Sequence, residues 1–159
     1  MKCIRQTPNE VQFELREREA ELLGFVLGSF PMAIEGWPQD PKAPKIPASQ
    51  PDPALLLEAL RERKVSNQQE VRLFVEESLR LNATTGTAHW TVSTQRMDWL
   101  LQVLNEVRVA SWYRLGCPEE DLDELFARMN PEQMQDFIRF FFSGEVISRL
   151  LDALETPEP

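Results

Sequence analysis

The amino-acid sequence predicts a mainly α-helical protein, a single-domain bundle of about five to six helices with a small two-stranded β ribbon. Three observations predict this class: several long segments repeat apolar residues at helical spacing, two short segments alternate apolar and polar residues, and the length of 159 residues suits one core. The domain is expected to span residues 1–155, and residues 156–159 are expected to fray.

A strand and a helix are expected near the N-terminus. Val11–Leu15 alternates apolar and polar residues, which is typical of a strand with one buried face. Residues 17–30 have helical spacing, and Pro31 is expected to end that helix. Residues 31–53 hold seven of the twelve prolines, so they are predicted to form an extended loop.

Two helices are expected in the next segment. Asp52 and Pro53 suit the cap and first turn of a helix over 53–64. Ser66, with Gln69 three residues later, has the spacing of a capping box and predicts the start of a second helix.

Ala88–Ser93 alternates apolar and polar residues and predicts a second strand. Isolated strands of this length are not stable in water. We therefore expect Ala88–Ser93 to pair with Val11–Leu15 in the two-stranded ribbon.

Three more helices complete the expected fold. The first begins at Ser93 or Thr94 and ends with Gly116 in the left-handed conformation. A short helix over 118–129 begins with acidic residues, which suit the positive end of the helix dipole. Asn130-Pro131 predicts the start of a last helix that runs to about Leu154.

Charge and rare residues argue against several functions. The net charge is −9, and from Val65 onward eight Lys and Arg stand against sixteen Asp and Glu, so we expect no nucleic-acid or membrane-surface partner. Cys3, Cys117 and the single His89 are too few for a zinc site, a Cys–His nucleophile pair or a disulfide framework. No cofactor, metal or catalytic residue is predicted. The start lacks a signal-peptide pattern, so a cytoplasmic location is expected.

Arg108 falls within the apolar arc of the helix that follows Thr94. Such an arginine either extends its charged end to water or finds a carboxylate. We hypothesise a partly buried ion pair with Glu145, with Arg149 as a surface partner of Glu145 four residues on. A structural pair of this kind predicts that Arg108→Ala costs about 3 to 5 kcal/mol. The hypothesis takes as the inner face of the last helix Phe137, Phe140, Phe141, Gly144, Ile147, Ser148 and Leu151.

The last helix is apolar on its other side as well, which is typical of a central helix or one covered by a second subunit. We therefore expect self-association as a homodimer through this second side. The interface candidates are Phe142, Val146, Leu150 and Leu154.

Residues 104–108, LNEVR, followed after five residues by 114–116, RLG, resemble the pattern LN-acid-x-R…RLG of a bacterial domain-of-unknown-function family best represented in actinobacteria. Glu145 and Arg149 resemble the closing motif of that family, although Gly144 and Val146 replace its Gln and Ser. The resemblance implies no activity. Genes of the family often lie next to the adaptor of the Clp protease, which implies a role in regulated proteolysis. The motif residues that carry over, without a known role, are Asn105, Arg108, Arg114, Glu145 and Arg149.

The function expected from the sequence is a non-enzymatic interaction or regulatory module with a protein partner. The absence of a nucleophile–base pair, a phosphate loop and a metal cluster from the sequence favours it. The alternative is a small-anion-binding protein or enzyme, in which Arg108, Arg114 and Asn105 hold the anion and Glu145 acts as acid or base.

Overall fold

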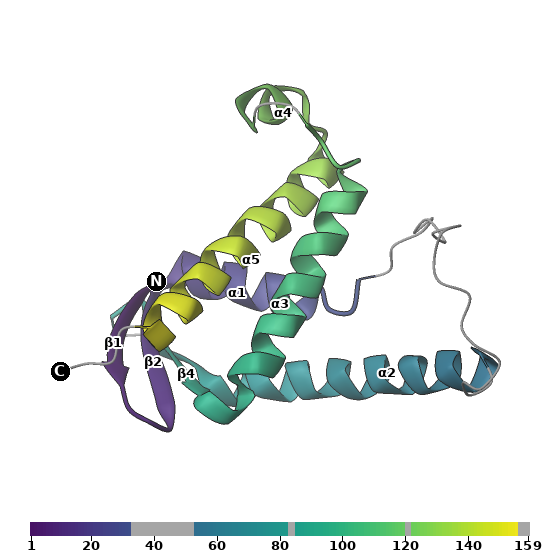
Figure 1. Cartoon of the computed structure of the whole chain (residues 1–159). Coiled ribbons are helices and arrows are strands. Elements are labelled where there is room, and N and C mark those ends of the chain that lie inside the picture. Colours follow the sequence, from purple (N-terminus) through teal and green to yellow (C-terminus); the bar gives the residue numbers. More distant parts are fainter. Residues whose placement is uncertain (33–52, 83–84, 120–121, 156–159) are drawn as a thin grey trace.

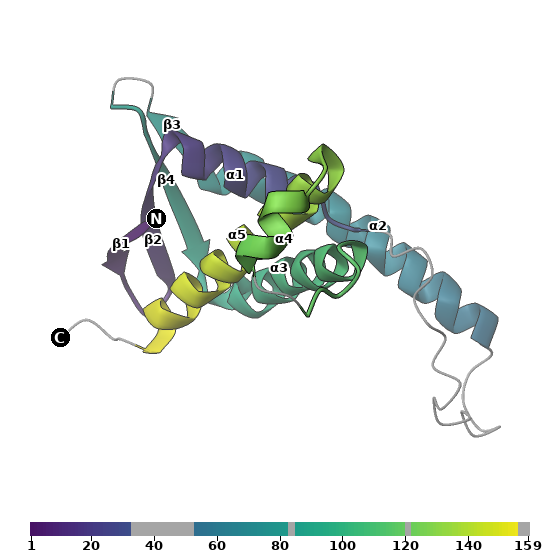
Figure 2. The same ribbon diagram turned by 90° about the horizontal axis from the view of Figure 1, so that it is seen from above.

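The structure, a computed structural model, describes residues 1–32, 53–82, 85–119 and 122–155 (Figure 1). The chain first forms strands β1 and β2 and then helices α1 and α2, a second pair of strands, β3 and β4, and finally helices α3, α4 and α5. Their bounds are β1 Lys2–Gln6, β2 Glu10–Arg16, α1 Glu17–Gly28, α2 Pro53–Ser78, β3 Leu79–Asn82, β4 Thr87–Ser93, α3 Thr94–Arg114, α4 Leu122–Arg128 and α5 Pro131–Glu155. The helices gather on one side of the sheet (Figures 1 and 2).

The sheet corrects the predicted two-stranded ribbon. Among the described residues it has four antiparallel strands in the order β1-β2-β4-β3. The expected pairing of its two central strands is present, with Phe13 opposite Trp90. The two outer strands were missed because β1 is mostly exposed and lacks an apolar alternation, and because β3 follows α2 without a break. The fold is still mainly helical.

Helix α2 corrects a second expectation. The two helices predicted on either side of Ser66 are one continuous helix of 26 residues. No glycine or proline lies between Pro53 and Ser78 to interrupt it, and a serine inside a helix carries only a modest penalty. Of the predicted proline-rich loop, residues 33–52 lie outside the described part of the chain, as does the predicted tail over residues 156–159.

The inner face of the sheet packs on the helices around Trp90, which is fully buried. Its ring lies 5.7 Å from that of Phe13 on the neighbouring strand and 6.3 Å, edge to face, from that of Phe74 on α2. Its indole N–H donates to Ser78 Oγ at 3.2 Å. Trp90 therefore joins the sheet to the end of α2 by apolar contacts and one hydrogen bond.

The predicted end of α3 and the predicted start of α5 are confirmed, whereas the short helix between them begins at Leu122 and not at Pro118. Gly116 follows α3 with a φ of +85°, and its N–H donates to the Tyr113 carbonyl at 2.9 Å. Before α5, Gln133 N–H donates to Asn130 Oδ1 at 2.8 Å while Asn130 N–H donates to Gln133 Oε1 at 3.1 Å, which is a reciprocal cap. None of the helices in the described ranges has the length and apolar composition needed to cross a membrane.

The predicted inner face of α5 is only partly correct: Ile147 packs against the core and Phe140 contacts Trp112, but Phe141 and Leu151 are exposed. The residues that this helix buries are Asp136, Ser143, Val146, Leu150 and Ala153. Phe141, which was expected inside, is 57% exposed. The prediction ranked the faces of the helix by hydrophobicity, and the observed orientation instead buries a carboxylate and a hydroxyl.

Glu19 joins β2 to the first turn of α1. Its carboxylate accepts hydrogen bonds from the Arg16 N–H at 2.8 Å, from Arg16 Nη2 at 3.1 Å and from the Met1 amino group at 2.5 Å. Burial by itself raises the pKa of Glu19, but these hydrogen bonds and the two positive charges outweigh it and lower the pKa to about 2.

Trp90→Ala should lower the free energy of unfolding by about 3 to 5 kcal/mol, because it removes a buried aromatic side chain and leaves a cavity. Urea denaturation followed by far-UV circular dichroism measures this change. The matched control is His89→Ala, an exposed neighbour on the same strand, for which we expect a loss of about 1 kcal/mol or less. Equal losses in the two variants would contradict the assigned inner face.

The stability of the wild type should fall between about pH 4.5 and pH 2 because of Glu19. Its pKa is lower in the folded state than in the unfolded chain, so its stabilising effect is complete above the unfolded value and disappears as the carboxylate is protonated. We expect about 1 to 2 kcal/mol, less than the full shift, because Arg16 is exposed and water screens the pair.

Urea denaturation at a series of pH values measures this loss. Glu19→Gln should flatten the curve in that range, whereas the exposed neighbour Glu17→Gln should leave it unchanged. Parallel curves for the wild type and Glu19→Gln would show that the Glu19 contacts do not stabilise the fold.

Candidate functional site

Arg108 does not form the ion pair that the sequence analysis proposed. It is exposed, and its guanidinium carbon lies 5.3 Å from the centre of the Phe140 ring. A Cβ atom added at Gly144 would lie only 3.5 Å from Arg108 Nε, so the arginine side chain extends across the surface of α5 at that glycine. Arg108 therefore extends its charged end to water, and its guanidinium makes a cation–π contact instead of an ion pair with a carboxylate.

Glu145 is exposed on α5 and has a different partner. Its Oε1 accepts a hydrogen bond from Arg149 Nε at 3.0 Å, which confirms the expected surface pair four residues apart. Asn105 lies on the exposed side of α3. The structure therefore does not bring the residues of the predicted anion site, Arg108, Arg114 and Glu145, together in one place.

The predicted dimer interface is also corrected. Val146 and Leu150 belong to the buried core of the chain, so they are not available to a second subunit. Phe142 packs partly buried against the same core, and Leu154 is exposed near the end of α5. Phe142, Val146 and Leu150 mark the inner side of the helix, and the exposed Phe141 lies elsewhere on it.

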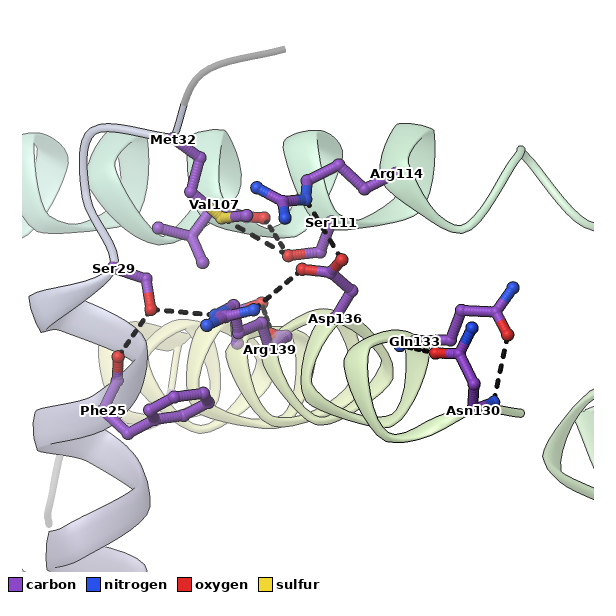
Figure 3. Close-up of polar contacts among 11 residues, drawn as sticks. Phe25, Ser29, Met32, Val107, Ser111, Arg114, Asn130, Gln133, Asp136 and Arg139 are labelled. Atoms are coloured by element: carbon purple, nitrogen blue, oxygen red, sulfur yellow. Dashed lines mark hydrogen bonds and ion pairs between the residues drawn. The ribbon is translucent and has the colours of Figure 1, made fainter. Parts of the chain in front are cut away.

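Arg114 is the predicted residue that reaches a polar cluster. Asp136 is buried between two arginines (Figure 3): its Oδ2 accepts from Arg114 Nε at 3.1 Å and its Oδ1 accepts from Arg139 Nη1 at 2.8 Å. Arg139 Nε also donates to Ser29 Oγ at 2.9 Å. These four residues, hereafter the Asp136 cluster, connect α3, α5 and the end of α1.

The two arginines of the cluster differ in how exposed their side chains are. The side chain of Arg139 is 15% exposed, and its guanidinium lies 4.6 Å from the centre of the Phe25 ring. The Arg114 side chain is 49% exposed, and the hydrogen bond recorded for it uses one of its five N–H donors. The cluster holds two positive charges and one negative charge.

Sequence reasoning missed Asp136 and Arg139 because it placed them outside the inner face of the last helix. A usable signal lies in the order of the elements. Only the short helix α4 separates α3 from α5, so these two helices are expected to pack as antiparallel neighbours. The end of α3 then lies near the start of α5, and an acid in the first turns of α5 is within reach of Arg114. Asp136 and Arg139 are also three residues apart, which places them on neighbouring positions of one helix surface.

A second feature of this end of the molecule is a group of three phenylalanines, hereafter the aromatic surface. The ring of Phe137 lies 5.9 Å from that of Phe126 on α4 and 6.1 Å, stacked, from that of Phe141. Phe126 is 54% exposed and Phe141 is 57% exposed. Rings that contact each other and still face water present an apolar area to solvent.

Comparisons with protein-family models, curated proteins and solved structures found no match. In the parts of the chain that the structure describes, no three His, Cys, Asp or Glu side chains come together as a metal site requires.

Asp136→Asn should lower the free energy of unfolding by about 3 kcal/mol, because it leaves the nearly buried Arg139 without a charged partner. The matched control is Glu145→Gln, which breaks an exposed pair and should cost about 0.5 kcal/mol or less. Arg108→Ala should cost about 1 kcal/mol or less, the value of an exposed cation–π contact, in place of the larger loss expected for a buried ion pair. Urea denaturation followed by circular dichroism compares the three variants, and a loss for Asp136→Asn as small as that of Glu145→Gln would contradict the role of the cluster.

Proposed function

We propose that the protein is a non-enzymatic interaction or regulatory module that binds a partner protein through the aromatic surface. One observation supports this function: Phe126 and Phe141 are exposed, and both rings contact the partly buried ring of Phe137 between them. Aromatic side chains are the usual anchors of protein interfaces, where their burial supplies most of the binding free energy.

The charge around the aromatic surface indicates the chemistry of the partner. Over residues 122–155 the sequence has seven Asp and Glu against three Arg, and Glu124 and Glu132 are exposed on the two helices that carry the rings. A partner segment with Lys or Arg beside its apolar residues is attracted to such a surface. The proposed occupant is an amphipathic helix of another protein with aromatic or aliphatic anchors flanked by basic residues.

A second copy of this chain is the competing occupant. The two copies would bring equal negative charges together, which opposes association of identical acidic surfaces. The side of α5 first expected to form a homodimer is buried in the core through Val146 and Leu150. A partner of opposite charge is therefore the stronger proposal.

The biological setting belongs to the same proposal. The family resemblance of residues 104–116 favours a partner from the machinery of regulated proteolysis, and a cytoplasmic location fits that setting. No catalytic residue is part of the proposed function, because binding by the aromatic surface requires none.

The experiment places the photo-crosslinker p-benzoylphenylalanine at Phe141 and, in a separate variant, at Leu73. Leu73 is a matched control because it is 56% exposed and belongs to α2, a helix that lies apart from α4 (Figure 1). We expect one predominant cross-linked protein from position 141 that is absent from position 73. Mass spectrometry of the cross-linked peptide should show apolar residues at helical spacing beside Lys or Arg.

Binding of the identified protein is then measured by titration with both purified components. Phe141→Ser should raise the Kd at least about tenfold, since it removes an interface anchor, whereas Leu73→Ser should leave it unchanged. Cross-links only between copies of this chain would replace the proposed partner with a second copy. The same adducts from both positions would overturn the role of the aromatic surface.

A further inference from the structure

A hollow of about 510 Å³ lies beside the Asp136 cluster. This volume is within the range of pockets that bind small molecules. Among the residues that the structure describes, those that line it include two arginines and no acid, although the chain as a whole has a net charge of −9. They are Gly24, Phe25, Gly28, Ser29, Pro31, Met32, Arg114 and Arg139.

Asp136 positions the two arginines without occupying the hollow. It is buried and accepts one hydrogen bond from each guanidinium, so the pair keeps an excess of one positive charge. Arg139 is fixed by Ser29 and by the Phe25 ring, whereas Arg114 is half exposed and has N–H donors beyond the one that Asp136 accepts. A guanidinium presents its donors in a planar fork that matches a carboxylate.

Two glycines of α1 keep the hollow open. A Cβ atom added at Gly24 or Gly28 would meet no other atom within 4 Å, so packing does not require glycine at either position. Alanine would favour the helix. Both glycines also line a second hollow, whose wall includes the apolar Phe30, Val65 and Val75 and the charged Arg72 and Glu76.

We propose that this hollow binds a small organic acid, with its carboxylate on Arg114 and Arg139 and its apolar body along Gly24 and Gly28. The single excess positive charge matches a monoanion. Phe25, Pro31 and Met32 stand in the same lining as the arginines, so an organic acid can contact apolar groups there that an inorganic ion cannot use. This site is separate from the aromatic surface, and its test does not depend on a protein partner.

The experiment titrates the full chain with hexanoate and follows the backbone amides and the arginine Nε–H signals by ¹H–¹⁵N NMR. We expect saturable shifts of Arg114, Arg139, Gly24 and Gly28 with a millimolar Kd. Hexanol, which lacks the charge, and acetate, which lacks the apolar body, should each bind at least about tenfold more weakly. Equal binding of hexanol, or no saturable shift with hexanoate, would overturn the proposal, and tighter binding of hexyl phosphate would overturn the choice of a carboxylate.

Variants separate binding from folding. Arg114→Gln should raise the Kd for hexanoate at least about tenfold, while Arg149→Gln, which changes another half-exposed arginine, should leave it unchanged. Gly24→Leu should fill the hollow and abolish binding without lowering the Tm, whereas Gly24→Ala should retain binding. Unchanged affinity in Gly24→Leu, or equal loss in the two arginine variants, would contradict the assigned position of the ligand.

Discussion

The position of α5 depends on one buried carboxylate. Asp136 accepts hydrogen bonds from Arg114 at the end of α3 and from Arg139, which in turn binds Ser29 at the end of α1. A buried carboxylate without these partners would lose several kcal/mol, roughly, relative to water, so rotations of α5 that separate Asp136 from both arginines are strongly disfavoured. The same rotation places Val146, Leu150 and Ala153 in the hydrophobic core, so the polar and apolar contacts of the helix agree on one orientation.

The sequence predicted elements better than it predicted faces. Local signals located both central strands, the end of α3 at Gly116 and the start of α5 at Asn130, because each depends on residues close together in the chain. The outer strands were missed because an edge strand such as β1 buries little and needs no apolar alternation. The division at Ser66 failed because a cap signal matters only where something interrupts the helix.

The candidate site was predicted only in part, for a physical reason. The Glu145–Arg149 surface pair was predicted correctly, whereas the hydrogen bond of Arg114 to Asp136 was not predicted. Asp136 and Arg139 form their hydrogen bonds because α1, α3 and α5 pack together. The residue pattern within α5 does not indicate which helices it packs against, so these contacts could not be predicted from the sequence. Arg108 is a second example. Its position in the apolar arc of α3 does not determine whether its guanidinium contacts an aromatic ring or a carboxylate, and in the structure it contacts the Phe140 ring.

The orientation of α5 runs against the hydrophobicity of its own residues. The observed face buries the polar Asp136 and Ser143 together with Val146 and Leu150, while Phe141 is left 57% exposed. Sequences that depart from local preference in this way do so most often at functional sites, where stability is given up for a surface or a charge. The same rotation of α5 produces both features proposed to bind: it leaves the phenylalanine rings facing solvent and holds Arg139 over Phe25 at the edge of the hollow. Asp136 is therefore the residue through which the fold and the two proposed functions are connected.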